Sequence, residues 1–69
     1  MRNVAQNLKT LRVKKNLEQK DVAKETGLSL STIINIESGI TSDISINTIV
    51  KLAEFFDVKV HEFVYKEFE

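Results

Sequence analysis

The sequence predicts a single all-α domain, residues 1–69, built from five short helices. Apolar residues recur at intervals of three and four, which is the spacing of one helical face. Proline is absent, and each of the two glycines follows a helical stretch, so no linker divides the chain. No two alternating runs are joined by a two-residue turn, as an all-β domain of this size would require. Without cysteine, the fold depends on one apolar core.

The first helix is expected over about Asn3–Lys15. Asn3, with Gln6 three residues later, is a plausible capping pair at its start. Basic residues gather in the last turn, where the helix dipole favours them, and Asn16 can take the left-handed conformation that ends the helix. The apolar stripe of this helix consists of Val4, Leu8 and Leu11.

The second helix is expected over Gln19–Thr26 and the third over Leu30–Glu37. Gly27 ends the second helix because glycine adopts positive φ most readily. Ser29 is a good N-cap for the third helix, and Gly39 follows its end. The residues expected to face inward are Val22 and Ala23 in the second helix and Ile33 and Ile36 in the third.

The fourth helix is expected over Ile46–Phe56, with Ser45 as its N-cap and Asp57 as its breaker. A short fifth helix is expected over about Lys59–Lys66, presenting Phe63 and Val64 to the core. The β-branched residues of this last segment also permit a strand. Five helices remain the better interpretation. The inner face of the fourth helix consists of Ile49, Leu52, Ala53 and Phe56.

The formal net charge is zero, but the charges are unevenly distributed. The first 24 residues hold seven basic and two acidic residues, a net charge of +5, and the rest of the chain carries −5. An anionic partner could therefore dock on the N-terminal part. Charge asymmetry also arises by chance on a small solvated surface, so it identifies no partner without a motif.

The stretch from Gln19 to Ile36 has the residues that a helix-turn-helix requires. Ala23 is small at the centre of the second helix, where the third must pass close, and Gly27 makes the turn. Larger apolar residues on either side can anchor both helices to the rest of the domain. Each of these spacings alone is weak evidence. Their combination with one preceding and two following helices favours a helix-turn-helix over an unrelated helical bundle.

The chain resembles the Cro and λ-repressor-like helix-turn-helix proteins, also called the xenobiotic-response-element family, over nearly its whole length. The resemblance implies a compact five-helix λ-repressor-like domain and a sequence-specific, double-stranded DNA-binding transcriptional regulator. It also implies a homodimer that places the third helix in the major groove of a two-fold operator. The cytoplasm is the default location, because no stretch has the pattern of a signal peptide or a membrane span. The segments that carry the resemblance are Asn7–Arg12, Leu17–Ser29, Ile36–Gly39, Ser45–Ala53 and Val58–Phe63.

Base contacts are expected from the third helix, because its N-terminal part meets base edges in this motif. Leu30 and Ile34 lie on the side away from the core stripe and can contact thymine methyl groups; partial burial by neighbouring loops is the alternative. Asn35 can pair with adenine. No Arg or Lys lies between Glu25 and Lys51, so we expect an A·T-leaning operator. The predicted base-contacting residues are Ser29, Leu30, Ser31, Ile34 and Asn35.

Phosphate contacts are expected from polar and basic residues around the motif, although the sequence leaves open which lysines touch DNA. Ser38 can alternatively cap the C-terminal turn of its helix. By resemblance, Arg12 also forms an ion pair with Glu37 that fixes the third helix against the first. The predicted phosphate-contacting residues are Gln19, Arg12, Thr32, Ser38, Lys9 and Lys20.

Three departures from the family pattern affect these expectations. Glu18 replaces the usual small polar cap of the second helix, and Lys59 that of the fifth. The loop Ile40–Ile44 lacks basic residues and contains Asp43. We therefore expect fewer phosphate contacts and a shallower salt dependence than in strongly basic relatives.

Other classes of function find little support in the sequence. One histidine, His61, and no cysteine leave no catalytic constellation and no metal-ligand set, so we expect no enzyme, metal, cofactor or small-molecule ligand. No stretch is apolar and long enough to serve as a signal peptide or membrane span. The serious rival is a protein-interaction module, antitoxin-like or a co-regulator, that keeps the fold and binds DNA weakly.

The C-terminal residues suggest a dimer interface. Val60, Val64 and Phe68 recur every four residues with Tyr65 beside them, and they cannot all be core in so small a domain. A frayed C-terminal tail is the alternative. The homodimer is favoured because reading an operator normally requires two half-sites.

Overall fold

The computed structural model describes residues 3–40 and 43–68 and confirms the all-α prediction. Every helix boundary in this part of the chain lies within one residue of the expected position, and the final segment is a helix rather than a strand. The helices are α1 (Val4–Lys14), α2 (Gln19–Thr26), α3 (Leu30–Ser38), α4 (Ile46–Phe55) and α5 (Val60–Tyr65).

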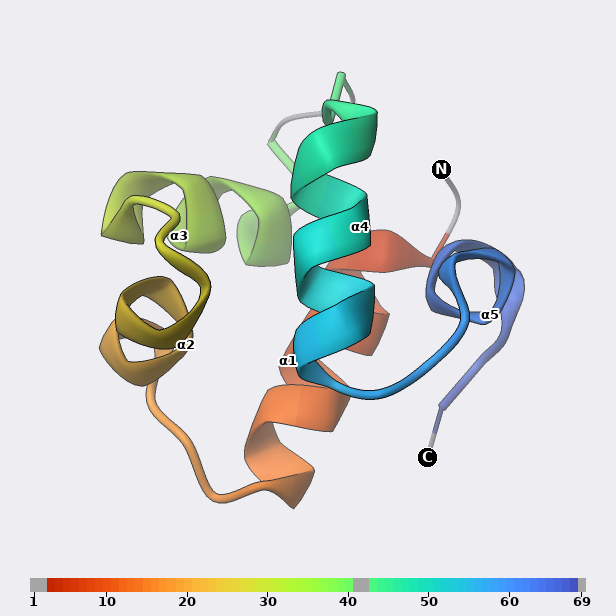
Figure 1. Ribbon diagram of the computed structural model, residues 1–69, viewed down its shortest axis with the longest axis horizontal. Helices are drawn as coiled ribbons and strands as arrows, with labels where there is room; N and C mark the ends of the chain where they lie inside the picture. Colours follow the sequence, from red (N-terminus) through yellow and green to blue (C-terminus); the bar gives the residue numbers. More distant parts are fainter. Residues whose placement is uncertain (1–2, 41–42, 69) are drawn as a thin grey trace.

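The helices surround a single core, and the described part of the domain measures about 24 × 24 × 19 Å. α4 stands at the centre, with α2 and α3 on one side of it and α5 on the other (Figure 1). α1 packs against α3 and α5, and α2 packs against α3 and α4. All five helices contribute to the core, whose largest fully buried apolar side chains are Val4, Leu8, Val22, Ile33, Ile36, Ile49, Leu52 and Phe63.

Local chemistry explains where most helices begin and end. The Ser29 and Ser45 hydroxyls accept backbone N–H groups at the starts of α3 and α4, at 3.1 and 3.2 Å. Gly27 and Gly39 end α2 and α3 with φ of +78° and +77°. Asn16 has the expected left-handed conformation, with φ of +59°.

The expected capping pair at the start of α1 is wrong. Asn3 makes no side-chain cap; its amide instead donates to the Tyr65 carbonyl at the end of α5, at 2.9 Å. The last carbonyls of a helix lack partners within it, so this tertiary contact satisfies a group that a local cap would leave unpaired.

The helices α2 and α5, whose N-cap residues are Glu18 and Lys59, are capped by carboxylates of their own first turns. The Asp21 carboxylate accepts the Glu18 N–H at 2.8 Å, and the Glu62 carboxylate accepts the Lys59 N–H at 3.2 Å. Each acidic side chain also lies in the first turn, where the helix dipole favours negative charge. The missing small polar caps are therefore replaced by carboxylates three residues further on.

Asn7 is a fully buried polar residue that joins α1 to the C-terminal part of the chain. Its amide nitrogen donates to the Phe63 carbonyl at 2.8 Å and to the Lys66 carbonyl, and its oxygen accepts the Phe68 N–H at 3.3 Å. Because these hydrogen bonds satisfy both ends of the amide, Asn7 can be buried without a large desolvation cost.

Candidate nucleic-acid interface

α2 and α3 form a helix-turn-helix whose turn is held by local hydrogen bonds. The Gly27 N–H donates to the Ala23 carbonyl at 3.0 Å. The Thr26 hydroxyl donates to the Val22 carbonyl at 2.7 Å and accepts the Leu28 N–H at 3.3 Å. Leu28 packs against the core. The turn is therefore fixed from both sides, and α3 leaves it in a defined direction.

The outward face of α3 exposes uncharged side chains. Ser31 and Asn35 are exposed, and Leu30 and Ile34 are each 43% exposed although both are large and apolar. Ile33 and Ile36 occupy the opposite, buried face. The arrangement offers apolar, hydroxyl and amide groups to a partner, which are the groups that can contact base edges in a major groove.

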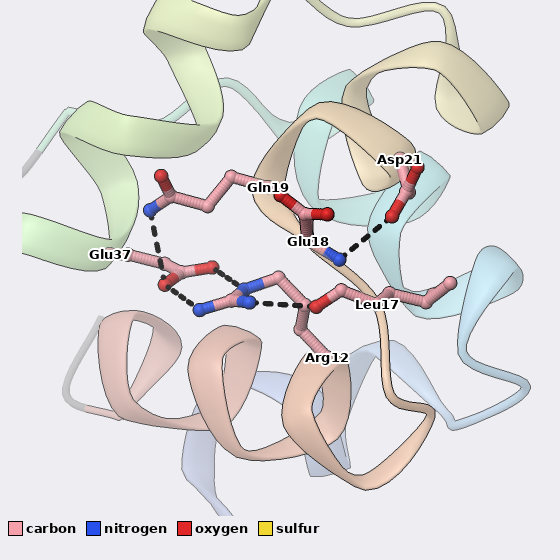
Figure 2. Close-up of polar contacts among 6 residues, drawn as sticks. All are labelled: Arg12, Leu17, Glu18, Gln19, Asp21 and Glu37. Atoms are coloured by element: carbon pink, nitrogen blue, oxygen red, sulfur yellow. Dashed lines mark hydrogen bonds and ion pairs between the residues drawn. The ribbon is translucent and has the colours of Figure 1, made fainter.

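Arg12, Gln19 and Glu37 form a network that ties α1, α2 and α3 together (Figure 2). Arg12 Nε donates to Glu37 Oε2 at 2.7 Å, and Arg12 Nη2 donates to Glu37 Oε1 at 3.0 Å. Arg12 Nη1 donates to the Leu17 carbonyl at 2.8 Å, and Gln19 Nε2 donates to Glu37 Oε1 at 3.3 Å. The Arg12 and Glu37 side chains are only 15% and 6% exposed.

The hydrogen bond from Glu37 raises the pKa of Arg12 above its ordinary value, against the opposing effect of desolvation. The guanidinium therefore stays charged at neutral pH. A bidentate, shielded pair of this kind orients α3 more rigidly than a solvent-exposed lysine pair would.

The structure places the predicted phosphate-contacting residues in different environments. Lys9 and Lys20 are exposed on α1 and α2, whereas the Thr32 hydroxyl lies 2.8 Å from that of Ser29. The Ser38 hydroxyl donates to the Asn35 carbonyl at 2.9 Å and accepts the Ile40 N–H at 3.3 Å, so it closes the last turn of α3. The proposed DNA contacts of all these residues remain predictions.

The described part of the loop after α3 contains no basic residue. Ile40 is 81% exposed and Asp43 is exposed, while Thr41 and Ser42 lie outside the described residues, as does Arg2 in the basic N-terminal part. A hollow between α3 and the start of α4 is lined by Thr32, Asn35, Ile36, Asp43, Ile44, Ser45 and Thr48. Asp43 therefore adds negative charge near one edge of α3.

The expected dimer surface needs one correction. Val64 is 8% exposed and belongs to the core, because α5 turns this residue inward beside Phe63. Val60 and Phe68 are half-buried and also pack against the core. Tyr65 is 63% exposed, with its ring centroid 5.7 Å from that of His61. Of the predicted residues, Tyr65 is thus the most accessible to a second copy.

Sequence reasoning missed the structural role of Asn7. The residue lies on the same side of α1 as Val4, Leu8 and Leu11, all of them buried. A polar residue within an apolar stripe is the signal that could have revealed it, because a buried amide requires partners. Its partners come from the other end of the chain, and spacing alone does not identify them.

Over 3–40 and 43–68, no three side chains among His, Cys, Asp and Glu gather as a metal site would require. None of the helices in this part of the chain has the length and apolar character needed to cross a bilayer.

Comparison with known proteins adds independent findings. A helix-turn-helix family model matches residues 8–63. A protein of Methanocaldococcus jannaschii described as the uncharacterized HTH-type transcriptional regulator MJ0272 is 44% identical over 63 residues, covering 90% of this chain and 94% of the relative.

Two solved structures are similar over most of the chain. The N-terminal DNA-binding domain of SinR from Bacillus subtilis superposes with a TM-score of 0.89 at 25% identity, covering 97% of both chains. SinR, the master regulator for biofilm formation, in complex with DNA superposes with a TM-score of 0.83 at 26% identity, covering 88% of this chain and 97% of that one.

Proposed function

Because the chain belongs to the helix-turn-helix family of DNA-binding transcriptional regulators, we propose that it binds a two-fold operator as a homodimer with α3 in the major groove. The family is a class of DNA-binding regulators and not of enzymes. The proposed place of action is the cytoplasm, and the proposed binding needs no cofactor. The observation that best supports this proposal is the outward face of α3. This face is uncharged and exposed, and the ion pair of Glu37 with Arg12 holds it in place.

The proposed contacts divide into two classes. Ser31 and Asn35, with Leu30 and Ile34 beside them, face the bases, and Asn35 is the residue suited to pair with adenine. Ser29, which precedes α3, belongs to the same class. Exposed Lys9 and Lys20 supply phosphate contacts near the paired Arg12 and Gln19, together with Thr32 and Ser38 on α3. The base contacts determine which DNA sequence is bound, and the phosphate contacts determine where the protein sits on the duplex.

Selection from random duplex DNA followed by gel shifts tests this proposal. The selected half-sites should be A·T-rich where α3 contacts them. Asn35→Ala should weaken binding by roughly 5- to 150-fold per half-site, which corresponds to the loss of one bidentate base contact. Gln6→Ala, which removes an exposed amide from α1, is the matched control and should bind as the native chain does.

The rival function is a protein-interaction module that keeps this fold. The zero net charge and the exposed Asp43 favour it, because both weaken attraction to phosphate. Complete absence of DNA retention at low salt would support this rival. Half-sites dominated by G·C at the α3 positions would instead contradict only the proposed base contacts.

The proposed homodimer uses the surface around Tyr65, with half-buried Val60 and Phe68 at its edge. Tyr65→Asp places a charge at the most exposed of these positions and should shift the sedimenting species towards monomer. Val13→Asp is the matched control, because Val13 is 58% exposed on α1. An unchanged dimer for Tyr65→Asp would contradict this surface.

A further inference from the structure

We propose that α3 recognises the C5-methyl groups of pyrimidines through Leu30 and Ile34, so that thymine and 5-methylcytosine are both accepted where these side chains meet the groove. The inference rests on the proposed DNA-binding function and extends it to the chemistry of the site that is read. It concerns an apolar pair on the outward face of a helix that otherwise presents hydroxyl and amide groups.

The two side chains are exposed in the free protein although both are large and apolar. Each is 43% exposed, and they lie four residues apart, on the same side of α3. Residues of the core stripe next to them, Ile33 and Ile36, are 0% and 1% exposed. Leu30 and Ile34 are therefore available to a partner while the helix itself stays anchored.

The composition of α3 excludes the commonest alternative means of reading bases. The helix contains no Arg or Lys, so it cannot make the bidentate contact to guanine O6 and N7. Its only charged side chain, Glu37, is 6% exposed and paired with Arg12. Apolar contacts by Leu30 and Ile34 are therefore a large part of the contacts that this face can make in a major groove.

The partner of such an apolar contact is defined by groove chemistry. Among the base edges of the major groove, the C5-methyl of thymine is the apolar group, and cytosine lacks it. A methyl group on C5 of cytosine occupies the corresponding position on the ring. Leu30 and Ile34 therefore distinguish a methylated from an unmethylated pyrimidine, whichever base carries the methyl.

Helix geometry sets the spacing of the two methyl groups. Four residues advance about 6 Å along an α-helix at 1.5 Å per residue. Successive base pairs are about 3.4 Å apart, so the pair spans about two base steps. Each methyl contact should change affinity roughly fourfold, which corresponds to burying one small apolar group.

The test starts from the operator recovered by selection and changes only its methyl groups. Replacing each thymine in turn by uracil removes the methyl and keeps the base pair. At two positions per half-site, about two steps apart, binding of the native protein should fall roughly fourfold. At those positions a C·G pair should bind more weakly, and 5-methylcytosine should recover roughly fourfold over cytosine.

Protein variants assign each methyl to a side chain. Leu30→Ala should bind thymine and uracil operators equally at one position, and Ile34→Ala at the other, because the contacting side chain is gone. Val13→Ala, which shortens an exposed residue on α1, should keep the full thymine preference. Thermal unfolding should show all three variants folded, since none of the three native side chains is buried.

The outcomes separate this inference from the function on which it rests. If no DNA is retained, the proposed function fails. If the operator is bound but uracil binds as tightly as thymine, or 5-methylcytosine no better than cytosine, the methyl inference alone is overturned. A thymine preference that persists in both alanine variants would also overturn it.

Discussion

Replacing Glu37 with glutamine removes the carboxylate that holds α1, α2 and α3 together. The native carboxylate accepts from Arg12 Nε at 2.7 Å, from Arg12 Nη2 at 3.0 Å and from Gln19 Nε2 at 3.3 Å. A glutamine at this position keeps one acceptor oxygen, but its NH₂ group faces donors. The charge that compensates the shielded guanidinium is lost at the same time.

The expected loss of unfolding free energy is about 3 kcal/mol. Removing one partner of a buried pair costs about 3–5 kcal/mol. The lower end applies because Arg12 keeps its bond to the Leu17 carbonyl at 2.8 Å and its side chain is 15% exposed. A domain of this length has a total stability of roughly 3–10 kcal/mol, so the variant loses a large share of it.

Urea unfolding followed by circular dichroism measures this loss. The midpoint should fall by about 3 M if the slope is near 1 kcal/mol/M, and the slope itself should not change. Glu54→Gln, at an exposed carboxylate on α4, is the matched control and should stay within about 0.5 kcal/mol. An apolar double variant, Arg12→Met with Glu37→Leu, should be more stable than Glu37→Gln, because no unpaired charge remains.

The refuting result is a Glu37→Gln protein that unfolds within about 1 kcal/mol of the native protein at an unchanged slope. That outcome would mean that water or a rearranged Gln19 compensates the guanidinium, so the network would not determine how α3 sits. Gel shifts on the same variant add a second readout. We expect weaker operator binding even at temperatures where the variant remains folded, because α3 is less firmly oriented.

Three other perturbations test the structure. Asn7→Ala should lower the unfolding free energy by about 2–3 kcal/mol and speed amide exchange in α5, because backbone groups of Phe63, Lys66 and Phe68 lose their partner; unchanged exchange would argue against this anchor. Gly27→Ala should cost about 1 kcal/mol in thermal unfolding, from backbone strain alone, since φ is +78° and an added Cβ would meet no atom within 4 Å; a cost several times larger would point to a clash. Lys20→Ala should reduce the slope of log Kobs against log salt by about 0.9 per subunit, and an unaltered slope would remove Lys20 from the phosphate contacts.

Helix positions could be predicted from the sequence because their signals are local. Spacing of apolar residues, the serines before α3 and α4, and glycines with positive φ all act within a few residues of one another. The position of α1 could be predicted in the same way, but the hydrogen-bond partner of Asn3 at its start could not. Asn3 resembles a local cap in the sequence, but its amide reaches Tyr65, a residue that only folding brings near.

In the candidate site, too, the features that depend on local sequence could be predicted, and those that depend on tertiary packing could not. The exposure of Leu30 and Ile34 follows from counting round one helix, with the buried stripe of Ile33 and Ile36 as reference. Val64 received two assignments from the sequence, to the core beside Phe63 and to the dimer surface, and its burial agrees with the first, because this short helix packs on two neighbours, α1 and α4. The interface residue predicted there is therefore a core residue.

The sequence by itself determined five helices, the helix-turn-helix and the uncharged outward face of α3, since these depend on periodicity, caps and composition. The tertiary structure alone decided that Asn7 anchors the C-terminal segment and that Gln19 joins Arg12 on the Glu37 carboxylate. It also decided which C-terminal side chains remain exposed. The physical reason is distance along the chain: a buried polar group must find partners, and which partners it finds depends on how the helices pack.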